Sequence, residues 1–190
     1  MNLSLNGPGL WYVTRATGIV SLLMLTFSVF LGVATRSRRS TRRLPRFLLV
    51  GLHRNVSLMV MVLLALHVLT TVVDTYTDIS LLDAFVPFLS QYRGIYLGLG
   101  ALAGDALIVL VLTSVLRERI GHRTWKALHW LSYLCWPVAL VHAWGTGTDP
   151  GAAWGRWIGY ACVAFVAGVV GWRLVIGARP DRADTLAPGR

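Results

Sequence analysis

The chain has 190 residues, of which 55% are hydrophobic and 14% are charged, and its mean hydropathy is +0.62. Soluble domains carry about 25% charged residues, so this composition excludes an ordinary soluble globular protein. The formal net charge is +10, but the basic residues gather in short turns between apolar blocks and not on a soluble face. We therefore expect a membrane protein that binds no nucleic acid.

Five apolar blocks follow one another along the sequence. A helix that spans a bilayer needs about 20 apolar residues. The blocks cover residues 18–34 (with a start near Trp11), 47–73, 94–116, 125–144 and 154–176. They predict an all-α polytopic membrane bundle of about five transmembrane helices. The apolar segment 79–90 is too short for a span and contains Pro87, so we expect a surface or re-entrant segment there.

Basic and acidic connections alternate along the chain. The turn 36–46 holds six arginines, and the turn 117–126 and the C-terminal end are also basic. The connections between them carry acidic residues instead: Asp74, Asp78, Asp83 and Asp149. This positive-inside pattern predicts an N-terminus outside the cell and a cytoplasmic C-terminus, with the basic turns touching anionic membrane lipid.

A second domain is not indicated. We expect residues 1–178 to form one membrane domain and residues 179–190, "RPDRADTLAPGR", to form a disordered cytoplasmic tail. Cys135 and Cys162 lie alone in separate predicted helices and form no C-x-x-C motif, so we interpret them as packing residues.

Four histidines lie within two of the predicted helices. His53 and His67 are 14 residues apart on the second helix, and His129 and His142 are 13 residues apart on the fourth. Both helices run in the same direction, so the histidines form two levels about 20 Å apart, with one histidine from each helix on each level. Ionisable residues inside a membrane usually mark a functional site. Two neutral imidazoles that face each other suit an iron porphyrin with two axial ligands, and two such levels predict an electron path through the bilayer.

The 13-residue spacing raises a geometric difficulty. At about 100° per residue, a 14-residue step returns to within about 40° of the same helix face, whereas a 13-residue step ends about 140° away. The fourth helix must therefore be distorted. Pro137 lies between its two histidines and predicts a kink there.

These histidine pairs, with "WKALHWLSYLCWPVALVH" at 125–142 and "WYVTRATG" at 11–18, resemble the ferric reductase-like transmembrane domain. That superfamily includes NADPH oxidases, ferric reductases and the haem-binding subunit of bacterial periplasmic methionine sulfoxide reductase. The resemblance extends over most of residues 11–176. It implies two b-type haems, an inner one held by His53 and His129 and an outer one held by His67 and His142.

The sequence also departs from the larger members of this family. NADPH oxidases and ferric reductases append a flavin- and nicotinamide-binding portion, and no glycine-rich nucleotide fingerprint follows the fifth apolar block here. We therefore expect the chain to bind no flavin or NAD(P)H. It would receive electrons from a separate flavin reductase or from membrane quinol and pass them to an unknown outer acceptor. This makes it the electron-transfer subunit of an oxidoreductase, expected in a bacterial inner membrane.

Other charged residues are candidates for supporting roles. Haem propionates need cationic partners near the membrane faces, and we expect Arg15 for the outer haem and Arg54 or Lys126 for the inner one. Asp105 falls midway along the third predicted helix, where a carboxyl group indicates a proton site or a structural polar contact.

Two other functions stay open from the sequence. One is a stand-alone ferric or oxygen reductase, whose outer haem donates directly to a soluble acceptor. The other is a haem-free transporter or metal-binding membrane protein that uses the histidines as a proton relay or as a copper or zinc site. The two histidines of one helix are about 20 Å apart, so only a cross-helix pair would share a metal ion, and two ligands make an incomplete site.

Overall fold

The structure is a computed structural model, and it describes residues 8–35, 45–74, 79–147 and 153–177. Within these ranges every regular element is a helix, which confirms the expected all-α fold. The helices are α1 (Pro8–Thr35), α2 (Arg46–Val73), α3 (Leu81–Phe85), α4 (Gly94–Val115), α5 (Arg117–Ile120), α6 (His122–His129), α7 (Ser132–Thr146) and α8 (Ala153–Gly177). The predicted tail 179–190 and the arginines at 36–43 lie outside the described residues.

Among the described residues, four helices are long and apolar enough to cross a membrane: α1, α2, α4 and α8. They agree with four of the five predicted spans. The remaining one, predicted as a single helix over 125–144, is divided into α6 and α7, which have 8 and 15 residues. The chain is therefore a helical membrane bundle in which the predicted fourth span is interrupted.

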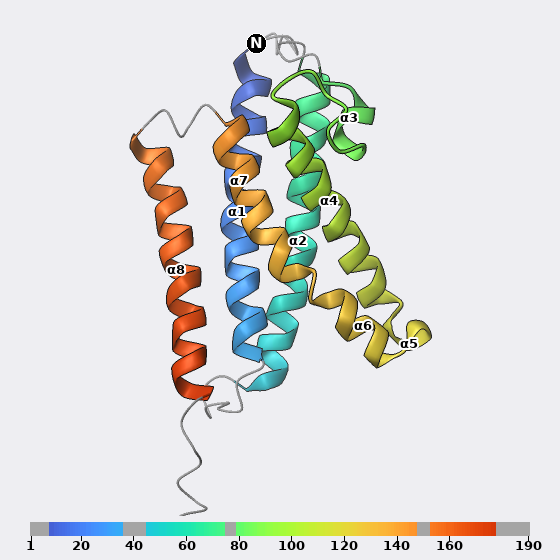
Figure 1. Cartoon of the computed structure of the whole chain (residues 1–190), viewed down its shortest axis with the longest axis vertical. Helices are drawn as coiled ribbons and strands as arrows, with labels where there is room; N and C mark the ends of the chain where they lie inside the picture. Colours follow the sequence, from blue (N-terminus) through green and yellow to red (C-terminus); the bar gives the residue numbers. More distant parts are fainter. Residues whose placement is uncertain (1–7, 36–44, 75–78, 148–152, 178–190) are drawn as a thin grey trace, which may run out of the picture.

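The bundle is built from two antiparallel helix pairs. The most extensive helix contacts join α1 to α2 and α4 to α7, and α7 also packs on α1. Figure 1 shows these four helices together, with α8 beside α1 and with α3 at the end where α2 stops and α4 begins. At the opposite end, α6 departs sideways from the bundle towards α5. The first pair contributes α2, which carries two of the histidines. The second pair contributes α7, which carries a third histidine, and α6, which precedes α7, carries the fourth.

The interruption between α6 and α7 lies at Trp130 and Leu131, several residues before Pro137. Proline has no N–H to donate to the carbonyl four residues earlier, and its ring crowds that carbonyl, so the distortion extends towards the N-terminus. Here four hydrogen bonds of 2.9–3.2 Å, between residues 127 and 134, join residues three apart instead of four. The expected kink is present between the two histidines. It arises at a tight turn before the proline and not at the proline itself.

This tight turn eases the difficulty with the 13-residue spacing. A 3₁₀ turn advances about 120° per residue, against about 100° in an α-helix, so four such residues add about 80° of rotation. The offset between His129 and His142 then falls from about 140° to about 60°, which is comparable to the offset of about 40° on α2. The interruption thus allows both histidines to face α2.

The indole of Trp136 fixes α7 to α1 between the two histidine levels. Its Nε1 donates a 2.9 Å hydrogen bond to Oγ1 of Thr26, a residue of α1 that is buried. A polar contact between helices is favourable in a membrane, where no water competes for the donor. This contact holds the C-terminal part of the interrupted segment against α1.

Candidate functional site

The structure brings the four helix-borne histidines together as two cross-helix pairs. The ring centres of His53 and His129 are 6.3 Å apart with an angle of 80° between the ring planes. Those of His67 and His142 are 6.5 Å apart with an angle of 84°. The pairs are the ones the sequence predicted, and they lie at two levels along α2.

These separations match the space that an iron atom with two imidazole ligands occupies. A metal–imidazole nitrogen bond is about 2.0 Å long, and the centre of an imidazole ring lies about 1.1 Å from its nitrogen. Two imidazoles on opposite sides of one iron therefore have their centres about 6.2 Å apart. Both pairs fit a bis-histidine porphyrin by this test.

Backbone carbonyls orient three of the four imidazoles. Nδ1 of His67 lies 2.9 Å from the carbonyl oxygen of Thr14, and Nδ1 of His53 lies 3.1 Å from that of Ser28. Nδ1 of His142 lies 2.8 Å from the carbonyl oxygen of Tyr96 on α4. A carbonyl can only accept, so Nδ1 carries the proton in each case and Nε2 keeps the lone pair that a metal binds.

Each of these carbonyls lies four residues before a glycine. In an α-helix the residue four positions on occupies the same face, one turn above the carbonyl. A Cβ at Gly18 would lie 3.0 Å from Cε1 of His67, and a Cβ at Gly32 would lie 3.5 Å from Cε1 of His53. A Cβ at Gly100 would overlap the ring of His142. Because these glycines have no side chain, each imidazole can approach the helix backbone closely enough to reach the carbonyl.

Sequence reasoning missed this arrangement, although a signal was present. Thr14 with Gly18 and Ser28 with Gly32 repeat a Thr/Ser-x-x-x-Gly pattern at a spacing of 14 residues. The histidines of α2 have the same spacing, and α1 packs antiparallel to α2. Two equal spacings on neighbouring helices indicate contact at two levels, and this match was available from the sequence.

A tryptophan packs on the ring of His129. Trp125, one turn earlier on α6, stacks on the imidazole with ring centres 5.1 Å apart and an angle of 27°. Its Nε1 lies 3.2 Å from Oγ of Ser114 on α4, to which it donates. His122 precedes Trp125 on the same helix, is exposed and lies at neither pair.

A cavity of about 660 Å³ lies between α1, α2, α4 and α7 at the level of the His67–His142 pair. Sites for small ligands and cofactors have volumes of about 300–1,000 Å³, so a porphyrin is of suitable size. Both histidines line the cavity, and most of its other walls are apolar. Two of the predicted supporting residues, Arg15 and Asp105, also line it, as does Trp11.

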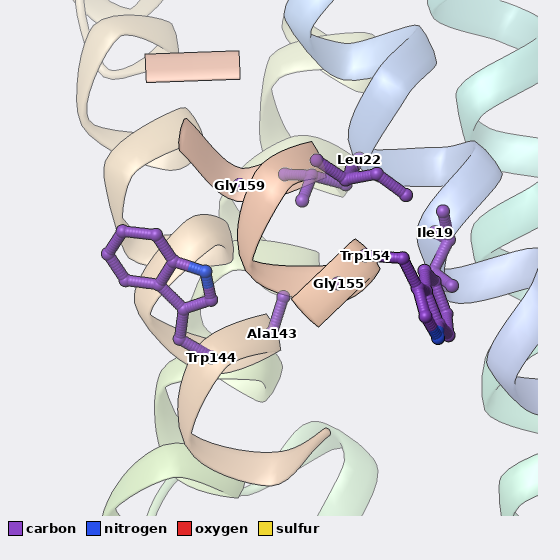
Figure 2. A pocket seen from close by; sticks show the side chains of 9 residues that line it. Ile19, Leu22, Ala143, Trp144, Trp154, Gly155 and Gly159 are labelled. Atoms are coloured by element: carbon purple, nitrogen blue, oxygen red, sulfur yellow. The ribbon is translucent and has the colours of Figure 1, made fainter. Parts of the chain in front are cut away.

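Arg15 is held between two tryptophans at the wall of this cavity. Its guanidinium carbon lies 4.6 Å from the ring centre of Trp11 and 4.9 Å from that of Trp154, which belongs to α8. Figure 2 shows Trp154 reaching from α8 to Ile19 of α1, around a smaller cavity of about 60 Å³. A cation between two aromatic faces is fixed in position, which suits a partner for a carboxylate of a bound porphyrin.

The other two predicted propionate partners lie near the His53–His129 pair. Arg54 follows His53 directly on α2, and Lys126 precedes His129 by three residues on α6; both side chains are exposed. Within the described part of the chain, no three His, Cys, Asp or Glu side chains converge on a point that would hold a bare metal ion.

Together, the fold and the site define a class of protein: a helical membrane protein with two facing histidine pairs inside its bundle. The sequence model of the family described as "Ferric reductase like transmembrane component" matches residues 17–140, and the chain belongs to this family. The match contains His53, His67 and His129. No curated protein and no solved structure matches the chain.

Family membership indicates a role in membrane electron transfer. Ferric reductase-like transmembrane domains generally bind haem and generally work with a separate redox partner. The chain is therefore an integral membrane protein of a haem-binding, electron-transferring family.

Proposed function

We propose that this protein carries single electrons across the membrane through two b-type haems. His53 and His129 hold one haem, and His67 and His142 hold the other. The observation that carries the proposal is the spacing of the two imidazole pairs, 6.3 and 6.5 Å between ring centres, which is the spacing of two ligands on one iron. The cavity beside His67 and His142 supports it further.

The chain's residues perform three tasks in this mechanism. The imidazoles of each pair would hold one iron, and a haem held by two histidines would supply one-electron transfer at that site. The carbonyls of Thr14, Ser28 and Tyr96 hold Nδ1 protonated and direct Nε2 to the metal. The apolar helices exclude water from the path. Along α2 the two levels are about 21 Å apart, a distance that covers most of the bilayer core.

The charge pattern supports a proposed orientation of the protein in the membrane. The end of the bundle that carries α5 and the start of α2 holds Arg46, Arg117 and Arg119, and we propose that it faces the cytoplasm. The N-terminus then lies outside and the C-terminus inside. Electrons enter near His53 from a flavin reductase or from quinol and leave near His67 to an outer acceptor, in a bacterial inner membrane.

A stand-alone ferric or oxygen reductase is the second candidate. The observation that favours this function is that the cavity extends beyond His67. There its wall also contains Asp74, Asp83 and Tyr92. This end lies near the proposed outer face, so a soluble acceptor would approach the outer haem closely. Reoxidation of the purified, reduced protein by a ferric chelate without any partner protein is the result that this second function requires.

Haem quantification and transmembrane electron transfer test the proposal together. The detergent-purified protein is expected to contain two b-type haems per chain by the pyridine haemochrome assay. Reconstituted into liposomes that enclose ferricyanide, it is expected to oxidise external dithionite faster than empty liposomes do. A well-folded protein that contains no haem after expression with ample haem would contradict the proposal and favour a haem-free transporter.

Replacement of Arg15 is expected to weaken retention of the haem held by His67 and His142. A charge-assisted hydrogen bond contributes about 1.5–3 kcal/mol, so Arg15→Gln should speed the loss of this haem by about tenfold or more. Trp154→Leu should act in the same direction, since it removes one face of the sandwich. The measurement is haem transfer to excess apomyoglobin. Trp157→Leu, on an exposed side chain of the same helix, is the matched control and should leave the rate unchanged.

A further inference from the structure

We propose that Asp105 takes up a proton when the His67–His142 site is reduced, so that electron transfer through this protein is coupled to protonation of a carboxyl group inside the membrane. The inference rests on the proposed function, because it requires a bound haem. Asp105 lies on α4, and its side chain lines the same cavity as the two imidazoles.

The position of Asp105 is between the two histidine levels. It follows Gly100, which contacts His142, by five residues, or about 7.5 Å along the helix. The direction is away from the proposed outer end, towards the level of His129. Around this depth most of the cavity wall is apolar, with Met61, Leu64 and Ile108, and the hydroxyl-bearing Ser21 also lines it. An ionised carboxylate in such surroundings is costly unless a positive charge lies close by.

The charged and titratable groups that line this cavity come from every helix around it. They are Arg15 on α1, His67 on α2, Asp74 directly after α2, Asp83 on α3, Tyr92 before α4 and His142 on α7. The guanidinium of Arg15 stacks on Trp11, one turn nearer the N-terminus, so it lies on the outer side of the His67 level, as Asp74 does. The carboxylate of Asp83 accepts from the backbone N–H and the hydroxyl of Ser80 at the N-terminus of α3. Among the residues that the structure describes, no cation that lines the cavity therefore lies at the depth of Asp105.

The charge balance at the site changes when one electron arrives. A ferric iron in a doubly deprotonated porphyrin with two neutral imidazoles carries a single positive charge, and the ferrous form carries none. In the oxidised state this charge stabilises the carboxylate of Asp105. After reduction the stabilisation is lost, and Asp105 binds one proton from water at the open end of the cavity. The electron stays on the iron, and reoxidation releases both the electron and the proton.

Redox titration of the haem-loaded protein as a function of pH tests this coupling. The midpoint potential of one haem is expected to fall with rising pH, by up to about 59 mV for each tenfold decrease in proton concentration. In Asp105→Asn that dependence should flatten, while two haems per chain remain. Asp83→Asn is the matched control, since it removes another carboxyl that lines the cavity, and it should keep the dependence of the wild type.

A second readout is the reduced-minus-oxidised infrared difference spectrum. A protonated-carboxyl band should appear on reduction of the wild type and be absent in Asp105→Asn. A potential that does not vary with pH, or a dependence that Asp105→Asn leaves intact, would overturn the inference and leave the proposed function standing. A wild-type protein without haem would instead overturn the proposed function, so the two failures are distinct.

Discussion

Replacing one histidine of the His67–His142 pair is expected to lower the haem content from two to one per chain. His67→Ala and His142→Ala should give the same result, because each leaves one iron with a single ligand in a wide cavity. The remaining haem should keep the absorbance spectrum of a bis-histidine site. The measurement is the pyridine haemochrome assay on protein that has passed size-exclusion chromatography.

The controls for this prediction come from the same chain. His122→Ala should retain two haems, since His122 is exposed on α6 and faces neither pair. His53→Ala and His129→Ala should each remove the other haem, so that a variant lacking His53 and His67 contains none. Two haems in His67→Ala, or loss of haem in His122→Ala, would show that the ligand assignment is wrong.

The membrane fold and the cross-helix pairing of the histidines could be predicted from the sequence because both leave strong signals. Long apolar blocks specify membrane helices, and ionisable side chains such as His67 and Asp105 stand out within them. The pairing of His53 with His129 followed from helix direction and rise alone. The family match over residues 17–140 confirms the predicted family.

The parts that the sequence left unpredicted depend on contacts between distant segments. The turn at Trp130 and Leu131 reflects the combined effects of Pro137 and of packing against α1 and α4, so its place could not be read from the proline alone. The sandwich around Arg15 needs Trp154, which is 139 residues further along the chain. No local pattern connects those two residues.

Glycine-to-alanine substitutions beside the imidazoles are expected to lower the haem content to different degrees. The loss should be larger where the new methyl group would lie closer to the imidazole ring. At Gly100 a methyl group would overlap the ring of His142, so Gly100→Ala should displace the ligand and lose the haem of that pair. At Gly18 the nearest atom of His67 is 3.0 Å away, which requires a small shift of the ring, and we expect a partial loss. At Gly32 the nearest atom of His53 is 3.5 Å away, an ordinary contact, and Gly32→Ala should retain its haem.

Gly104→Ala is the matched control for Gly100→Ala. The two glycines are one turn apart on α4, and a methyl group at Gly104 would meet only Leu64, at 3.9 Å. Both substitutions raise helix propensity by a similar amount, so a general effect on α4 would appear in both variants. Haem content should therefore fall in Gly100→Ala and stay at two in Gly104→Ala, with the two proteins equally monodisperse. Equal haem content in both would mean that close packing of His142 on the Tyr96 carbonyl does not position the ligand.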